Sequence, residues 1–192
     1  MRAEAAPALT RNQEARRARV IDAAMRLAAD GGYDAVQMRD VATTARVALG
    51  TIYRYFSSKD HLLAAVLVEW SQDLQGRLNQ RPSRAAEPVE RLVHVVRQAT
   101  RAMERQPLLA AALVTAISAP DPAVSGCQAD TTAIMVELLS APMDGVEPEL
   151  RAGIVRVLSH VWFSALIGWV NGWSNVGQVG DELEAAARLL LR

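Results

Sequence analysis

Apolar residues recur at helical spacing along almost the whole of this 192-residue chain, and this periodicity constrains the fold more than any other feature. Val20, Ile21, Ala24, Leu27 and Ala28 mark one face of a first helix, and no strict alternation extends beyond a few residues. Spacings of three and four residues place side chains on one face of a helix, whereas a strand needs a period of two. The sequence therefore predicts an all-α fold.

Glycines and prolines divide this pattern into about nine helices. Gly31 and Gly32 supply a stop after the first helix, because glycine adopts a left-handed backbone at low cost. Pro107 favours a first helical turn, where its missing amide is no loss. We expect helices at residues 12–30, 38–45, 49–56, 58–81, 89–103, 107–117, 125–140, 148–173 and 177–192.

The front of the chain has the pattern of a helix-turn-helix. Two short apolar stripes, at residues 38–45 and 49–56, are joined by the tight connection ARVA. The following stretch SSKDHLL is typical of a helix start, with Ser57 as the cap and Asp60 three residues on. We therefore expect a flexible N-terminal arm at residues 1–11, a helix-turn-helix domain at 12–57 and a second helical domain at 58–192.

Composition excludes some classes of protein and only permits others. The formal net charge is zero, but residues 1–60 hold 10 Arg or Lys against 7 Asp or Glu, which permits nucleic-acid binding without requiring it. The single cysteine, Cys127, cannot form a disulfide within the chain, and the first residues lack the apolar core of a signal peptide. The longest apolar run, residues 161–173, is shorter than the roughly 20 residues that span a bilayer. We expect a cytoplasmic protein without a membrane segment.

The stretch GTIYRYFSSKDHLL, from Gly50 to Leu63, gathers two of the three tyrosines and the only lysine of the chain. Helical geometry turns Ile52 and Phe56 toward the core, so that neighbouring side chains project outward. Phosphate contacts fix a DNA-reading helix in its groove, and tyrosine hydroxyls can supply them without a mobile charge. These features favour a DNA-recognition helix over residues 49–56.

Lys59 stands in the first turn of the next helix, where the positive end of the helix dipole disfavours a cation. A DNA phosphate at this helix end would reverse that cost, since helix N-termini bind anions. The alternative is that the tyrosines and Phe56 form a small core and that Lys59 is solvated. The residues alone leave both open.

The stretch VATTARVALGTIYRYFSSKDHLL resembles the DNA-binding domain of the TetR family of bacterial repressors, and the all-helical remainder agrees in length. The resemblance implies base contacts from the recognition helix and the start of the preceding helix, and backbone contacts from the aromatic and basic residues nearby. The base-contacting residues are Arg39, Gly50, Thr51 and Arg54, and the backbone-contacting residues are Tyr53, Tyr55 and Lys59. For Arg16, Arg17 and Arg19 a solvated face and a DNA contact fit equally well.

The chain departs from the family pattern in two places. Many relatives have glycine in the turn where this chain has Arg46, so we expect a non-glycine residue in a left-handed conformation, at a cost on the order of 1 kcal/mol. The second helix begins at Gln37-Met38 rather than with a Ser or Thr cap.

The helix expected at 148–173 is apolar on nearly every side, which requires cover all round. We expect a homodimer through this helix and the last one, as in the family, whose paired reading heads suit a palindromic operator. The family also responds to small molecules, which implies a cavity for a hydrophobic effector, although plain core fits the same residues. The candidates for its lining are Trp70, Met103, Leu109, Leu113, Met135, Trp162, Phe163 and Leu166.

Within the family, fragments such as RAMERQPLLAAAL resemble the repressors of cholesterol and steroid catabolism genes. This likeness implies a steroid-derived acyl-CoA thioester as inducer, with its nucleotide end near Arg97, Arg101 or Arg105; a relative that answers another hydrophobic ligand is the alternative.

An enzyme, or a ligand-binding protein without DNA binding, is the rival class. The three histidines lack metal-ligand spacing, and no nucleophile motif or phosphate loop is present, so we expect no catalytic residue, metal or cofactor.

Overall fold

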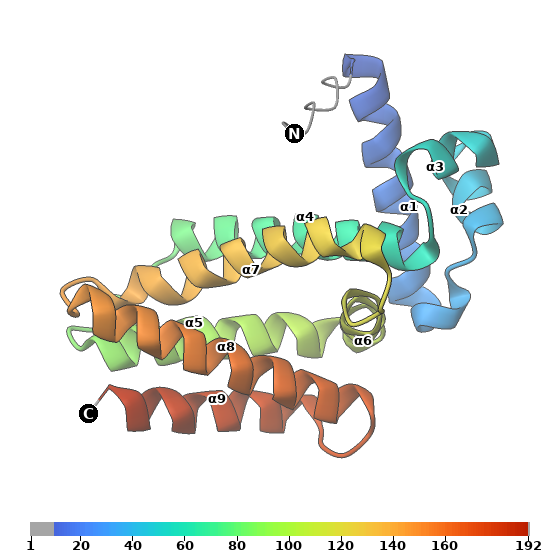
Figure 1. Cartoon of the computed structure of the whole chain (residues 1–192). Helices are drawn as coiled ribbons and strands as arrows, with labels where there is room; N and C mark the ends of the chain where they lie inside the picture. The colour runs from blue at the N-terminus through green and yellow to red at the C-terminus, as the bar shows by residue number, and fades with distance from the viewer. Residues whose placement is uncertain (1–9, 192) are drawn as a thin grey trace.

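The computed structural model describes residues 10–191, in which the chain forms nine α-helices, two 3-10 turns and no strand (Figure 1). The all-α prediction is confirmed. The helices are α1 (Arg11–Ala35), α2 (Met38–Ala45), α3 (Leu49–Tyr55), α4 (Lys59–Gln80), α5 (Pro88–Arg105), α6 (Pro107–Ile117), α7 (Ser125–Ser140), α8 (Pro148–Val170) and α9 (Val176–Leu190), with 3-10 turns η1 (Pro122–Val124) and η2 (Ala141–Met143).

The first helix begins at a capping box, in which Thr10 and Gln13 bond to each other's backbone amides. It is therefore helical from Arg11, and the rest of the arm predicted at residues 1–11 lies outside the described residues. Gly32 breaks the helix with a φ of 73°, as the sequence predicts, but the expected end at Asp30 is wrong because helical residues continue to Ala35.

The connection between α2 and α3 contains Arg46, which adopts a left-handed conformation with φ 54° and ψ 51°. Its amide and that of Val47 bond to carbonyls at the end of α2, which closes the turn. The predicted left-handed arginine is confirmed. Gln37 precedes α2 without a side-chain cap, as the sequence also predicts.

Ser58, not Ser57, caps α4, so the predicted cap is wrong by one residue. The Ser58 hydroxyl accepts a bond from the His61 amide at 3.0 Å and donates one to the Asp121 carboxylate at 2.6 Å. The second bond joins the start of α4 to the loop after α6, sixty-three residues away in sequence, and periodicity carries no information about such a partner.

Two large apolar cores lie along α4, and a small third one joins α5 to α6. The first combines α1, α2 and α3 with the start of α4 and one face of α6; the second lies among α5, α7, α8, α9 and the far part of α4. We call α1–α3 the head and α4–α9 the body, and Figure 1 shows the head at one end of the elongated body. Since α4 and α6 contribute to the head core while belonging to the body, they connect the two parts.

Helix α8 ends at Val170, one turn before the predicted Trp173. Its length and its mean hydropathy of 1.5 over an 18-residue window would allow it to cross a membrane. The expectation of no membrane segment therefore does not follow from hydropathy alone. A core helix of a globular protein passes the same test, and α8 packs here against α9, α7 and α6. Its outward side still carries exposed Leu150 and Val157.

Candidate nucleic-acid interface and ligand cavity

The short helix α3 is fixed to the head by one face and presents the other outward. Ile52 and Phe56 are fully buried, whereas 52% of Tyr53 is exposed. Gly50 is exposed, and a Cβ added there would meet no atom within 4 Å. The backbone at the start of α3 is thus open to a large partner, as the recognition-helix hypothesis requires.

Arg54 and Tyr55 form a stacked pair on the exposed side of α3. The guanidinium lies 5.3 Å from the centre of the Tyr55 ring, and its Nη2 donates to the Tyr55 hydroxyl at 3.4 Å. The same ring contacts Phe56 at the edge of the head core, with ring centres 6.3 Å apart. The core therefore restricts the motion of Tyr55, and Tyr55 restricts that of Arg54. Arg54 would then lose less side-chain entropy on contacting a base.

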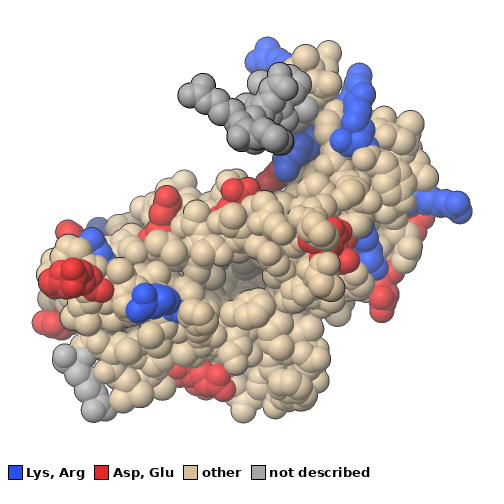
Figure 2. Space-filling model, in the orientation of Figure 1, with Lys and Arg blue, Asp and Glu red and all other residues tan. Residues whose placement is uncertain are grey.

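Arg39 is exposed in the first turn of α2, and no carboxylate of the described residues lies within ion-pair distance of it. A cation at a helix N-terminus is disfavoured by the dipole, so its position favours an anionic or base-edge partner outside the chain. Figure 2 shows basic side chains projecting from the outer edge of the head.

Lys59 is half-buried and bonded within the protein. Its Nζ donates to the Tyr33 carbonyl at 3.2 Å, near the end of α1, and lies 3.6 Å from the centre of the Tyr33 ring. These contacts offset the unfavourable dipole of α4 without any phosphate. Lys59 as a phosphate contact stays a prediction, but it is no longer needed to explain the residue.

Tyr33 is a residue that sequence reasoning missed. Its hydroxyl donates to the Asp60 carboxylate at 2.5 Å, and burial together with this bond raises the pKa of Tyr33 to about 12. Tyr33, Lys59 and Asp60 therefore tie the end of α1 to the start of α4. The only feature of the sequence that could have indicated this role is the position of Tyr33 directly after the glycines that break α1.

The arginines of α1 divide by their partners. Arg17 forms an ion pair with Glu69 at 2.9 Å and lies over the Phe56 ring at 5.5 Å, so it joins α1 to α4. Arg19 donates to the Ala45 carbonyl at 3.4 Å. Arg16 is exposed. Arg17 is therefore engaged within the chain rather than solvated. For Arg16 and Arg19 a solvated face and a DNA contact both stay open.

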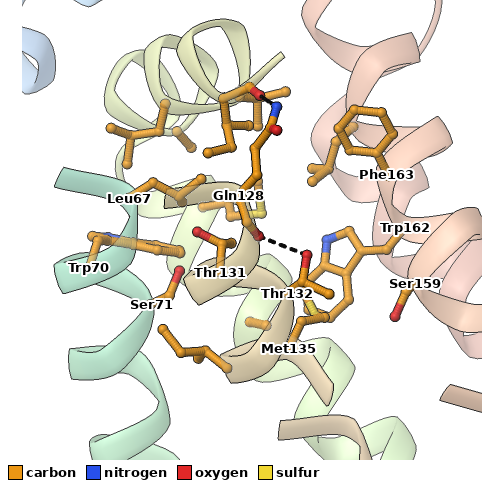
Figure 3. Close-up of a pocket in the computed structure, with 18 of the residues that line it drawn as sticks. Leu67, Trp70, Ser71, Gln128, Thr131, Thr132, Met135, Ser159, Trp162 and Phe163 are labelled. Atoms are coloured by element: carbon orange, nitrogen blue, oxygen red, sulfur yellow. Dashed lines mark hydrogen bonds between the residues drawn. The ribbon is translucent and has the colours of Figure 1, made fainter. Parts of the chain in front are cut away.

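The body contains a cavity of about 550 Å³, open to solvent on one side, between α4, α5, α6, α7 and α8 (Figure 3). Seven of the eight predicted lining residues border it, namely Trp70, Met103, Leu113, Met135, Trp162, Phe163 and Leu166. Leu109 does not: it is 1% exposed in the head core, one turn before Leu113. The surface of the body is hollowed near the middle of the face seen in Figure 2.

The wall of this cavity is apolar with a few polar side chains and has no Asp, Glu, Lys or Arg. Most of the polar groups are bonded within the chain: Gln128 donates to the Ile117 carbonyl, and Thr132 donates to the Gln128 carbonyl, each at 2.8 Å. The α7 residues Gln128, Thr131 and Thr132 were missed by sequence reasoning, because α7 has almost no amphipathic pattern.

Two helices reach from the head core to the cavity. Leu62, Leu63 and Val66 of α4 lie in the head core, and the next turns of the same helix border the cavity. Leu113 of α6 belongs to both the head core and the cavity wall. Anything that displaces the wall at Leu113 therefore acts on the head core, where α6 packs against α1 and α4.

Comparison with known proteins agrees with this arrangement. Residues 20–66 match the model of "Bacterial regulatory proteins, tetR family", and residues 86–190 match the model of "Tetracyclin repressor-like, C-terminal domain". The chain belongs to the TetR family. Its first matched segment covers most of the head with the start of α4, and its second covers α5 to α9.

Among relatives of this TetR-family chain is the "HTH-type transcriptional repressor KstR" of Rhodococcus jostii, 40% identical over 93% of this chain and 84% of the relative. A TetR transcriptional regulator from Rhodococcus sp. RHA1 has a similar structure, with a TM-score of 0.78, 29% identity and coverage of 94% of this chain and 97% of that one. Thermus thermophilus FadR, solved in complex with lauroyl-CoA, shares the fold with a TM-score of 0.72 and 23% identity, over 91% of this chain and 93% of that one.

This TetR-family chain is accordingly a transcriptional repressor that resembles KstR, not an enzyme. Within residues 10–191 no group of three His, Cys, Asp or Glu side chains could hold a metal ion. Burial raises the pKa of the Cys127 thiol, which disfavours the thiolate.

Proposed function

We propose that the chain represses transcription as a homodimer on a palindromic operator, with α3 in the major groove, and that a hydrophobic ligand in the body cavity releases it from DNA. The observation that carries the proposal is the sharing of α4 and α6 between the head core and the cavity wall. A repressor acts on the chromosome, so the proposed location is the cytoplasm.

The exposed face of α3 supports the DNA contacts. Tyr53 and Arg54 are exposed, Thr51 is half-buried, and Gly50 leaves room for close approach of the duplex. Arg39 and Arg54 can each bond bidentately to guanine, worth about 1–3 kcal/mol of discrimination per pair. Tyr53, Tyr55 and Lys59 are assigned to the phosphate backbone.

The unpartnered side of α8 and α9 supports the dimer. Leu150 and Val157 lie seven residues apart on one exposed face of α8, and Leu189 of α9 is 60% exposed. A two-fold, four-helix contact between copies would cover these side chains, because a C2 interface uses the same patch on both subunits.

The dimer is tested with a matched pair of variants. Val157 on α8 and Val136 on α7 are each 43% exposed. Val157→Glu places a charge in the proposed interface, and we expect a monomer with weak operator binding, whereas Val136→Glu should stay dimeric. Sedimentation and operator titration measure both. Dimerisation of Val157→Glu, or its loss in both variants, would contradict the assignment of the interface.

The effector is proposed to be a hydrophobic molecule joined to coenzyme A. The KstR-like sequence and the steroid resemblance support a steroid acyl-CoA thioester, and the acyl-CoA bound to a FadR of the same fold supports the class of ligand. Arg97 forms ion pairs with Asp181 at 2.8 Å and with Glu184 at 2.6 Å, so we do not propose it as a nucleotide contact. Arg101 and Arg105 are exposed and remain candidates.

Release is tested by operator titration on the DNA upstream of the chain's own gene, with and without steroid acyl-CoA thioesters. Ligand and operator should weaken each other's binding by the same factor, because coupling is reciprocal. Ala110 borders the cavity and is 4% exposed, so Ala110→Leu should fill part of the space and leave a repressor that binds DNA but releases poorly. If no ligand changes the operator affinity, the release mechanism is refuted, whereas the assignment of α3 to DNA is not affected.

A further inference from the structure

Two polar side-chain atoms of the cavity wall, Trp162 Nε1 and Thr131 Oγ1, are buried without a hydrogen-bond partner. Trp162 is only 4% exposed, and its indole extends from α8 with the nitrogen edge toward the α7 side chains (Figure 3). Buried polar groups are nearly always bonded in native proteins, and a lost bond costs about 1–3 kcal/mol. These orphaned atoms therefore call for a partner from outside the chain.

The neighbouring polar groups make the contrast clear. Thr132, Gln128, Ser159 and Ser118 also border the cavity, yet each bonds to a backbone carbonyl of the chain, at 2.7–2.8 Å. Backbone carbonyls of the chain thus satisfy most of the polar wall. The two buried atoms that stay unpaired come from two helices that contact each other, Trp162 from α8 and Thr131 from α7.

The chemistry of the pair specifies the partner. An indole N–H can only donate, and a threonine hydroxyl can donate or accept. The wall carries no Lys or Arg, and its histidine, His160, is exposed and bonded through Nδ1 to the Arg156 carbonyl at 2.7 Å. A buried carboxylate is therefore disfavoured. A neutral acceptor oxygen, such as a ketone carbonyl, within an otherwise apolar molecule satisfies both conditions.

We propose a specificity site in this wall, in which Trp162 reads a neutral acceptor oxygen on the buried part of the effector and Thr131 offers a second polar contact. This inference rests on the proposed ligand function and deepens it. The site selects oxygenated hydrophobic molecules, such as polycyclic ketones, over plain hydrocarbon bodies of the same shape. A saturated acyl chain leaves the indole N–H unpaired and binds more weakly.

The test compares androstanone with its parent hydrocarbon androstane, each displacing the fluorescent hydrocarbon diphenylhexatriene from the full-length protein. We expect androstanone to bind about tenfold more tightly, the size of one net hydrogen bond plus relief of an unpaired donor. Trp162→Phe removes the N–H and should abolish the preference, measured as the ratio of the two affinities. Trp173→Phe, at an exposed tryptophan outside the wall, should retain it.

A second pair covers the case in which Trp162→Phe fails to fold. Thr131→Val removes the orphaned hydroxyl and should reduce the preference, whereas Thr132→Val removes a hydroxyl that already bonds to Gln128 and should leave it unchanged. Equal affinity for both compounds in the natural protein would overturn the specificity site alone. Failure of all three compounds to bind would refute the cavity as a ligand site, and the proposed release with it.

Discussion

Replacing Gly50 with alanine should make the protein more stable and its operator binding weaker. The added Cβ would meet nothing within 4 Å in the free protein, because Gly50 is exposed at the second residue of α3. In the proposed complex the same methyl group would point at the duplex. The two readouts therefore move in opposite directions.

The expected magnitudes follow from this geometry. Glycine in a helix costs about 0.5–1 kcal/mol relative to alanine, and the lower end applies near a helix start. For a domain of this size that gain raises Tm by about 1–2 °C. An extra methyl group in a close-packed contact costs about 1–3 kcal/mol, which is about a 5- to 150-fold loss of operator affinity.

Gly76 supplies the matched control. It is exposed near the opposite end of α4, and a Cβ there also meets nothing within 4 Å. Gly76→Ala should raise Tm without changing operator affinity. Calorimetry and fluorescence anisotropy at fixed protein concentration measure the two quantities. Unchanged operator affinity in Gly50→Ala would refute close approach of α3 to DNA.

Two further predictions concern the head. Arg46→Gly should raise the free energy of unfolding by about 0.5–1 kcal/mol. The change removes a left-handed backbone penalty of about 1–2 kcal/mol, and the larger entropy of glycine in the unfolded chain offsets part of that gain. A lower urea midpoint would contradict this prediction. Because the pKa of Tyr33 is raised to about 12 from 10.0, the stability gained from its bond to Asp60 is present below pH 10 and lost as pH rises toward 12. In a tyrosinate absorbance titration, Tyr33→Phe should remove the component that ionises last and Asp60→Asn should lower its midpoint; no change in Asp60→Asn would contradict the bond.

Most helix positions could be predicted from the sequence, because helix limits depend on nearby residues. Pro107 and Gly32 mark a start and a break where the structure has them, and the turn geometry forces Arg46 into a left-handed conformation. The burial of Ile52 and Phe56 beside an exposed Tyr53 follows from a period of 3.6 residues. These features need no knowledge of what lies on the other side of each helix.

The tertiary structure alone decided which partners meet and where space is left. Ser58 bonds to Asp121 and Lys59 packs on Tyr33, both across long sequence separations. Leu109 and Leu113 look alike to any periodicity argument, yet only Leu113 reaches the cavity. An apolar stripe shows that a face is covered, but it does not show by what or how completely. Long-range packing determines both, and it leaves the indole nitrogen of Trp162 without a partner in the cavity wall.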